Sequence, residues 1–284
     1  MSKTYDIDAL LEEVVTLPSL PGTVAQLMKL VSDPQCSLSA VARAVAMDPG
    51  LAMKTLRLVN SAYYGVRQQI ATIEHAVVLL GIRVIKNLAF TATVFDVMKG
   101  SPDAFLRHSV MCGLAMRVLA EPSSKESFVE APEEALVYGL LHDVGKVILA
   151  QFLPEEHAQI AEISRTRNVR WHEAERQIIG VDHAELGARL AQQWKLPERL
   201  IEGIAGHHDL DQCTTPALKR TAAMLTVANY LCYACGVTSY EGCIGHVSDE
   251  AWAASQLTSA EVPLLLDRLF EELPLVGELI EVAV

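Results

Sequence analysis

Apolar residues recur at helical spacing along almost the whole chain, and no segment alternates apolar and polar positions for long enough to predict a strand. The helix expected from Phe105 illustrates the pattern, because one of its faces carries Phe105, His108, Cys112, Ala115 and Leu119. His108 is the only polar residue of that stripe, so we expect its side chain to point into a core. The pattern predicts an all-α fold, built as a multi-helix bundle.

Capping residues, prolines and glycines divide the chain into short helices. Asp48 and Pro49 suit the N-cap and the first position of a helix. Asp182 resembles an N-cap with Glu185 three residues further on. The Ser-, Glu- and Pro-rich stretch from Glu121 to Pro132 predicts a surface connection. The helices expected are those around Val24–Val31, Asp48–Asn60, Ile73–Leu80, Val84–Val97, after Phe105, after Glu155, after Asp182, Leu200–Gly206 and Leu218–Cys235.

His142 and Asp143 lie in the middle of an apolar run from Ala135 to Leu149. A helix that is apolar on nearly every face belongs in a core. A buried imidazole and a buried carboxylate need hydrogen-bond partners, a proton or a metal ion. We therefore expect the pair to lie inside a core helix and to mark a site.

Composition narrows the classes of function. The net charge of −12, from 35 acidic and 23 basic side chains, repels a phosphate backbone and disfavours broad nucleic-acid binding. The first residues lack the zones of a signal peptide, and we expect no apolar stretch of membrane-spanning length. The six cysteines, several on apolar helical faces, are typical of reduced core residues. These features place the protein in the cytoplasm.

Further histidines have predicted places in the same bundle. His183 falls in the first turn of a helix, and His207 and His208 end another. With inward-facing His108 and the pair His142-Asp143, they are spread over successive helices. Neutral imidazoles and a carboxylate suit iron, manganese or zinc, and helix bundles often hold such metals in their cores. The set predicts one or two divalent ions.

Three of these residues have expected individual roles. Asp143 could bridge two ions, and Lys146, one helical turn further on, could face a phosphate. A helix N-terminus disfavours an imidazolium, which should keep His183 neutral and available to a metal. The alternative is that the same residues form a hydrogen-bonded polar core with buried water.

The motifs around these residues resemble a known family. The segment Gly139-Leu-Leu-His-Asp-Val-Gly-Lys146, with His108 upstream, is similar to the HD superfamily of metal-dependent phosphohydrolases. Further motifs narrow the resemblance to the HDOD branch, over residues 14 to 210: Leu17-Pro-Ser-Leu-Pro21, Asp48-Pro49, Asn60-Ser-Ala-Tyr-Tyr-Gly65, Ala76-Val-Val-Leu-Leu-Gly81 and His183-Ala-Glu-Leu-Gly187. Membership implies an all-helical fold and a bacterial signalling or regulatory role, and most members are not known to be enzymes.

The catalytic relatives implied by this resemblance are the HD-GYP phosphodiesterases, which hydrolyse cyclic di-GMP at a two- or three-metal centre. Their motifs carry over as metal ligands onto His108, His142, Asp143, His183, His207, His208 and, where they have a final aspartate, Asn229. Asp143 and Lys146 would be the catalytic residues. The Gly-Tyr-Pro signature after the paired histidines is absent, and Ala104 stands where some relatives have a further glutamate, so a third metal is not expected.

Two other patterns have alternative readings. Cys232, Cys235, Cys243 and His246 have the residue types and pair spacing of a structural zinc site, but packing of an apolar helix explains the first two. The stretch Leu38–Asn60 can be read as a helix-turn-helix, with Lys54 and Arg57 toward a phosphate backbone. Bundle packing explains those helices equally well.

The sequence thus predicts an N-terminal helical subdomain (1–100), an HD-like helical bundle (101–215) and C-terminal helices (216–284). The function expected is that of a bacterial signal-transduction or regulatory HDOD module with an HD-type metal site. It would act through a signalling protein partner and could bind a nucleotide. The alternative is a divergent metal-dependent phosphodiesterase acting on a cyclic dinucleotide or a nucleotide phosphate. A DNA-binding regulator is the third hypothesis. Whether the protein is an enzyme stays open at this point, as does its oligomeric state.

Overall fold

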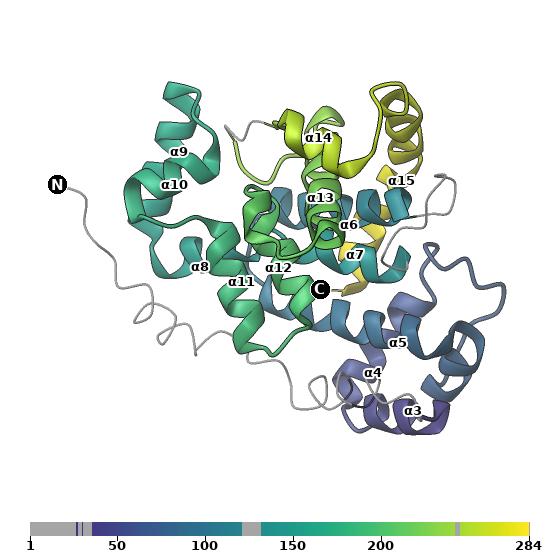
Figure 1. Ribbon diagram of the computed structural model, residues 1–284. Helices are drawn as coiled ribbons and strands as arrows, with labels where there is room; N and C mark the ends of the chain where they lie inside the picture. Colours follow the sequence, from purple (N-terminus) through teal and green to yellow (C-terminus); the bar gives the residue numbers. More distant parts are fainter. Residues whose placement is uncertain (1–26, 28–29, 31–35, 121–131, 242–244, 284) are drawn as a thin grey trace. The chain divides into compact units, whose positions relative to one another are not determined.

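The computed structural model describes Leu27, Leu30 and residues 36–120, 132–241 and 245–283 of the chain. Every regular element in this part is a helix (Figure 1), which confirms the all-α prediction. The helices are α3 (Leu38–Ala46), α4 (Pro49–Val59), α5 (Ile73–Val97), α6 (Asp103–Ala120), α7 (Pro132–Leu141), α8 (Val144–Phe152), α9 (Pro154–Arg167), α10 (Trp171–Ile179), α11 (His183–Gln193), α12 (Glu198–Gly206), the 3-10 turn η2 (Leu210–Gln212), α13 (Pro216–Ala234), α14 (Asp249–Ser255) and α15 (Val262–Ala283).

The chain divides into two compact units. The larger unit contains Ser101–Glu272, with α6 to α14 and the first half of α15. The smaller unit contains Leu17–Gly100 and Leu273–Val284, of which the described part holds α3, α4, α5 and the end of α15. The three predicted domain limits, at residues 1–100, 101–215 and 216–284, stay a prediction.

The smaller unit follows the capping pattern of its sequence. Asp48 caps α4 by accepting a hydrogen bond from the backbone N–H of Leu51 at 3.0 Å, and Asn60 is its C-cap. Gly81 has a φ of 86°, a conformation that favours glycine, and it kinks α5 where the sequence predicts a break. These contacts confirm the expected helix limits at both places.

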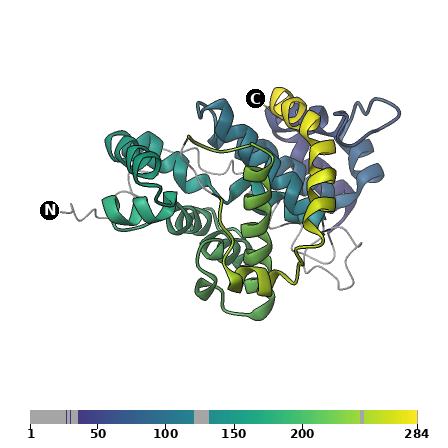
Figure 2. The same cartoon turned by 90° about the horizontal axis from the view of Figure 1, so that it is seen from above.

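In the larger unit, α13 packs against α6 and α12, and α14 lies across one end of it (Figures 1 and 2). The α6 helix also packs closely on α7, and α8 packs on α11. These contacts bring together α6, the α7–α8 junction, the start of α11 and the end of α12, which carry the predicted site residues.

Two details of the larger unit differ from the sequence prediction. His142 and Asp143 form a turn between α7 and α8 and do not lie inside one continuous helix. Asp143 is the N-cap of α8, yet its side chain caps no backbone N–H, because the carboxylate faces histidines and a lysine. The α10 helix was not predicted, since its short stretch Trp171–Ile179 is largely polar.

Some expectations fall outside the described residues. They are the break at Leu17–Pro21, most of the helix around Val24–Val31 and the connection at Glu121–Ala131. Cys243 of the alternative zinc site also lies there.

Two helical stretches, Ile73–Val97 and Glu134–Phe152, are long and apolar enough by composition to cross a membrane. The expectation that no apolar stretch reaches that length was therefore wrong. Of their most apolar windows, 56% and 78% of the residues are buried inside the protein, as in core helices of soluble proteins. The second stretch also contains the buried Lys146. Packing within the protein thus explains their apolar character.

Candidate metal centre

Six of the predicted site residues come together in the larger unit. Their ligand atoms form two groups, each with all atoms within 4.8 Å of one another. One group contains His108, His142 and Asp143; the other contains His183, His207 and His208. His208 is half-buried, and the other five have no exposed surface. The fold therefore assembles residues that are up to 100 positions apart in the sequence.

Two glycines of the motif around His142-Asp143 permit this assembly. A Cβ atom on Gly145 would lie 2.0 Å from the carbonyl oxygen of His183, so only glycine lets α8 approach the start of α11. A Cβ atom on Gly139 would lie 2.3 Å from the carbonyl oxygen of Cys112, so α7 can approach α6 in the same way. These close approaches bring Asp143 beside His183 and the α7–α8 turn beside α6.

Asp143 lies between the two histidine groups. Its Oδ1 atom is 3.1 Å from His183 Nε2 and 3.4 Å from His142 Nε2. Its Oδ2 atom is 3.6 Å from His108 Nε2 and 2.7 Å from Lys146 Nζ. The carboxylate thus faces both groups, which is the position expected of a bridging ligand.

Four histidines are oriented through Nδ1. The Nδ1–H groups of His108, His142 and His207 donate to the backbone carbonyls of Val237, Gly139 and Ile204 at 3.0, 2.7 and 2.6 Å. His183 Nδ1 lies 2.6 Å from Oε2 of the buried Glu175, which also accepts the backbone N–H of His183. A carbonyl oxygen can only accept, so Nδ1 carries the proton in the first three rings. When these rings are neutral, their Nε2 atoms therefore carry no proton and have a lone pair that can bind a metal.

Several buried atoms around the site lack hydrogen-bond partners: the Nε2 atoms of His108, His142 and His207 and the Oδ1 atom of Asn229. His183 Nε2 differs, because it lies 3.0 Å from His208 Nε2 and 3.1 Å from Asp143 Oδ1. Buried polar atoms are nearly always hydrogen-bonded, so a group of unpaired acceptors needs an explanation. Metal-binding histidines characteristically donate through one ring nitrogen and leave the other for the metal. The residues therefore fit a divalent metal ion.

The pKa values divide the histidines. Burial lowers the pKa of His108 to about 3 and holds those of His207 and His208 well below the usual value. Burial also lowers the pKa of His183, but the Glu175 carboxylate outweighs it and the net pKa is about 9. The expectation of a neutral His183 was therefore wrong, because the Glu175 carboxylate stabilises the imidazolium. Burial lowers the pKa of His142 as well, but Asp143 outweighs burial and the net pKa is raised. A metal would have to displace the protons of His183 and His142.

Charge also controls the carboxylate at the centre. Burial disfavours ionised Asp143, but nearby His142 and Lys146 outweigh burial and hold its pKa well below the usual range. Lys146 is only 2% exposed, and its ammonium group donates to Asp143 Oδ2 and to Ser239 Oγ. Asp143 is thus an anion, the form in which a carboxyl group binds a metal.

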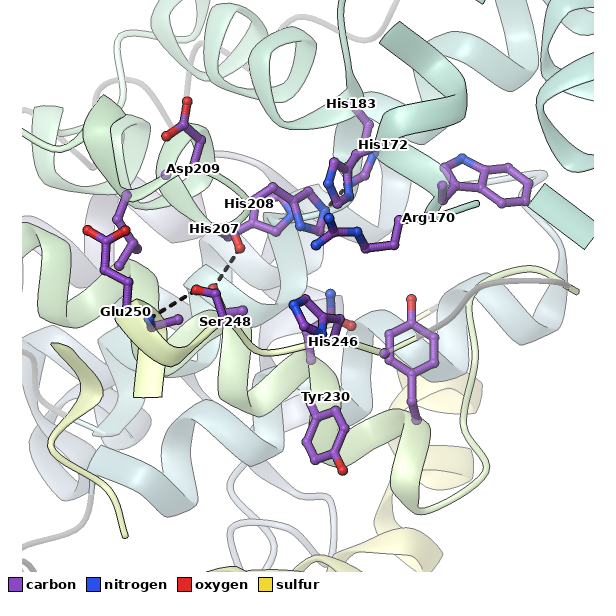
Figure 3. Close-up of a pocket in the computed structure, with 18 of the residues that line it drawn as sticks. Arg170, His172, His183, His207, His208, Asp209, Tyr230, His246, Ser248 and Glu250 are labelled. Carbon is purple, nitrogen blue, oxygen red and sulfur yellow. Dashed lines mark hydrogen bonds between the residues drawn. The ribbon is translucent and has the colours of Figure 1, made fainter. Parts of the chain in front are cut away.

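Asn229 is 6% exposed and lines a cavity of about 150 Å³ beside the histidines. The structure thus brings the predicted seventh ligand to the site. The same cavity is lined by Arg170, His172 and His246, which the sequence analysis did not assign to it (Figure 3). Their distance from the motifs along the chain hid them.

Glu175 was also missed by the sequence analysis, although a signal for it exists. It lies four residues after buried Trp171 and one after buried Ala174, on the apolar face of α10. A carboxylate at such a position needs a buried partner. His183 is that partner.

The structure also describes parts of the alternative zinc site and of the helix-turn-helix stretch. The five described cysteines are free, and Cys232 is fully buried in α13. His246 lines the cavity, and Cys243 is outside the described residues, so the zinc site stays a prediction. In the smaller unit Lys54 forms an ion pair with Asp96, which reduces its availability to a phosphate backbone.

Known proteins are similar to this chain over most of its length. An uncharacterized protein of Treponema pallidum (strain Nichols) is 29% identical over 202 residues, or 70% of this chain and 39% of that protein. The chain therefore spans about two fifths of the length of this curated relative.

Solved structures share the fold. A provisionally named phosphohydrolase from Shewanella amazonensis SB2B superposes with a TM-score of 0.74 at 25% identity, covering 97% of this chain and 98% of that one. An HDOD domain protein of unknown function from Geobacter sulfurreducens gives a TM-score of 0.78 at 23% identity, with 97% of each chain covered. A provisionally named signal transduction protein from Marinobacter aquaeolei VT8 gives a TM-score of 0.78 at 20% identity, covering 96% of this chain and 61% of that one.

The sequence itself matches the family model of the HDOD domain over residues 17–210. This match covers more than half of the chain and includes His108, His142-Asp143, His183 and His207-His208. The protein belongs to the HDOD domain family.

Proposed function

We propose that this protein is a bacterial, cytoplasmic signal-transduction module whose HD-type pocket binds one or two divalent metal ions. The observation that carries the proposal is the orientation of His108, His142 and His207. Each ring donates through Nδ1 to a backbone carbonyl and presents an unpartnered Nε2 to the same buried space. A polar core closed by its own side chains would pair these atoms with one another.

The donor set favours a borderline metal. Imidazole nitrogens with one central carboxylate suit iron, manganese or zinc, whereas magnesium and calcium prefer oxygen ligands. Asn229 adds a neutral amide oxygen and no further negative charge. We therefore expect iron, manganese or zinc, bound less tightly than by a site with two carboxylates.

A regulatory role is the better-supported use of this site. The chain has Asn229 in place of a carboxylate and lacks the Gly-Tyr-Pro signature of the cyclic-di-GMP phosphodiesterases. In addition, the smaller unit exposes large apolar side chains that a protein partner could cover: Leu38, Met47, Met53, Val78 and Leu79. A signalling protein partner is therefore part of the proposal.

A metal-dependent phosphohydrolase is the second candidate. It is favoured by Lys146, which lies beside Asp143 and lines the cavity, and by the similarity to the provisionally named phosphohydrolase from Shewanella amazonensis SB2B. A bound metal would supply Lewis-acid charge next to a phosphate. The chain's own contribution would be the cation of Lys146, oriented by Asp143 and Ser239.

The first experiment is the metal content of protein purified without oxygen or chelator. We expect one or two ions per chain in the parent and none in Asp143→Ala. Because Asp143→Ala leaves Lys146 buried without its partner, His207→Gln is made alongside it, and circular dichroism checks the fold of both. His157→Gln is the matched control, since His157 is largely buried but lies outside both ligand groups. It should retain the metal.

Parent protein that stays empty after anaerobic reconstitution would overturn both candidate functions. With metal bound, hydrolysis of the monoester p-nitrophenyl phosphate and of the diester bis(p-nitrophenyl) phosphate separates them. Turnover by the parent that is lost in Asp143→Ala would support the phosphohydrolase, whereas loaded protein without turnover supports the signalling module.

A further inference from the structure

The cavity beside the metal centre has hydrogen-bond donors on one side and carboxylates on the other. Arg170 supplies the positive charge, because burial lowers the pKa of His172 to about 4. Arg170 and His172 lie on one side, from the start of α10, and His246 faces them from the segment before α14 (Figure 3). The two carboxylates of the lining, Asp209 and Glu250, lie on the other side (Figure 3). In a chain with a net charge of −12, a wall of this composition is an unusual local feature.

Arg170 is held in place by its neighbour Glu173. The Nε and Nη2 atoms of Arg170 lie 2.9 and 2.5 Å from Glu173 Oε1, and the Arg170 backbone N–H donates to Glu173 Oε2. A guanidinium has five N–H groups, so this pairing leaves donors for a ligand. In Figure 3 the guanidinium extends over the cavity toward His208 and His246. Arg170 thus offers an oriented cation at the cavity.

The start of α10 adds donors beside Arg170. His172 lies in the first turn of this nine-residue helix, where backbone N–H groups and the helix dipole favour an anion. Its ring stacks on His208, with centroids 4.0 Å apart and an interplanar angle of 20°. The same lining holds Asn229 Oδ1, a buried, unpartnered acceptor that suits the metal and leaves a phosphate to the donors of Arg170, His172 and His246.

Helix capping alone does not explain why an arginine side chain stands at position 170. The reciprocal contact that caps α10 uses the backbone of Arg170 and the side chain of Glu173. The arginine side chain is not needed for it. The exposed pair Arg165–Glu162, five residues earlier on α9, has a comparable geometry of 2.7 Å and lines no cavity described in this unit.

We propose that Arg170, His172 and His246 form a subsite for the terminal phosphate of a small phosphate monoester, next to the metal ions. The proposal deepens and rests on the proposed metal-binding function. A terminal phosphate has three free oxygens, so it can contact the metal centre, Arg170 and His246 together, whereas a phosphodiester has only two. Arg170 supplies the oriented fork that planar recognition of phosphate requires.

Calorimetric titration tests this subsite with three probes: inorganic phosphate, phenyl phosphate as the monoester and dimethyl phosphate as the diester. Each is titrated into manganese-loaded and metal-free protein, and the metal content of every sample is measured. We expect phosphate and phenyl phosphate to bind the loaded parent more tightly than dimethyl phosphate. In Arg170→Gln the dissociation constant of phenyl phosphate should rise about tenfold, and in His246→Gln about threefold. Both variants should keep the full metal content.

Arg165→Gln is the matched control, because it removes the same charge from an exposed pair on the neighbouring helix and should leave binding unchanged. Equal affinity of Arg170→Gln and the parent would overturn the subsite, as would loaded parent that does not bind phenyl phosphate or prefers the diester. These results differ from a failure of the metal proposal, in which the parent holds no metal. In that case the metal-free titration still tests whether Arg170 contributes to phosphate binding.

Discussion

Two polar groups from the chain's motifs behave in opposite ways in the two units. In the smaller unit, Asn60 donates from Nδ2 to the backbone carbonyls of Leu56 and Ile70 and accepts from the N–H of Ile70, at 2.8, 2.8 and 2.7 Å. In the larger unit, the Nε2 atoms of His108, His142 and His207 have no hydrogen-bond partner. Asn60 thus joins the loop at Ile70 to the end of α4 by hydrogen bonds. The second group is oriented by its surroundings but left open for a ligand.

This difference shows how motif residues that look equally important in the sequence can be assigned to stability or to ligand binding. A side chain whose donors and acceptors are all used by the backbone contributes to stability. A side chain that is held on one side and unpaired on the other is prepared for a ligand. Substitutions in the first group should therefore change unfolding without changing metal binding, whereas substitutions of the three histidines should chiefly change metal binding.

The largest effect is expected at Asn60. Asn60→Ala removes three hydrogen bonds and leaves the N–H of Ile70 without a partner, which should lower the free energy of unfolding by about 2–4 kcal/mol. Urea denaturation measures this loss, and metal content per folded chain should stay at the parent value. The exposed neighbour Gln68 provides the control, because Gln68→Ala should change stability by less than about 0.5 kcal/mol. A loss of metal in folded Asn60→Ala would contradict the separation of the two groups.

The next effect concerns the carboxylate behind His183. Glu175→Gln removes the charged partner of His183 Nδ1, and such changes typically weaken metal binding by about 10–100-fold. Competition with a fluorescent chelator measures the affinity above pH 9, where His183 has lost its proton in the parent as well and relief of proton competition cannot mask the effect. Glu173→Gln, on an exposed glutamate of the same helix, should bind metal as the parent does. An unchanged affinity in Glu175→Gln would show that the contact has no role in orienting the ring.

The same contact predicts a pH dependence. The pKa of His183 is about 9 in the metal-free fold, so below that pH a metal must displace a proton. The dissociation constant for manganese should fall as pH rises from 7 toward 9, by at most about tenfold per unit, and then level off. In Glu175→Gln the pKa of His183 should fall, and the slope between pH 7 and 9 should become smaller, with part of it kept by the raised pKa of His142. A parent affinity that is constant over this range would refute the assigned proton.

The smallest effect is expected from completing the ligand set. Asn229→Asp adds a negative charge at the unpartnered Oδ1 position and should tighten manganese binding by about tenfold. Asn168→Asp, at the exposed C-cap of α9, makes the same change in net charge and should have no such effect. If both variants bind equally well, Asn229 is not a ligand and only the overall charge matters.

Much of the architecture could be predicted from local sequence. The helical spacing of apolar residues gave the all-α class, and Asp48 with Pro49 marked the start of α4, because capping depends on neighbours in the chain. The inward direction of His108 also followed from its stripe, and the residue is fully buried. The resemblance to the HDOD family supplied the other candidate ligands.

The sequence by itself determined the helices, the residue types of the candidate centre and the family. Only the tertiary structure decided that His142-Asp143 forms a turn, that Glu175 raises the pKa of His183, and that Arg170 and His246 reach the same cavity. The physical reason is the distance along the chain over which each interaction acts. Helix periodicity and capping are set within a few residues, whereas hydrogen-bond pairing, burial and charge depend on segments that meet only in the fold.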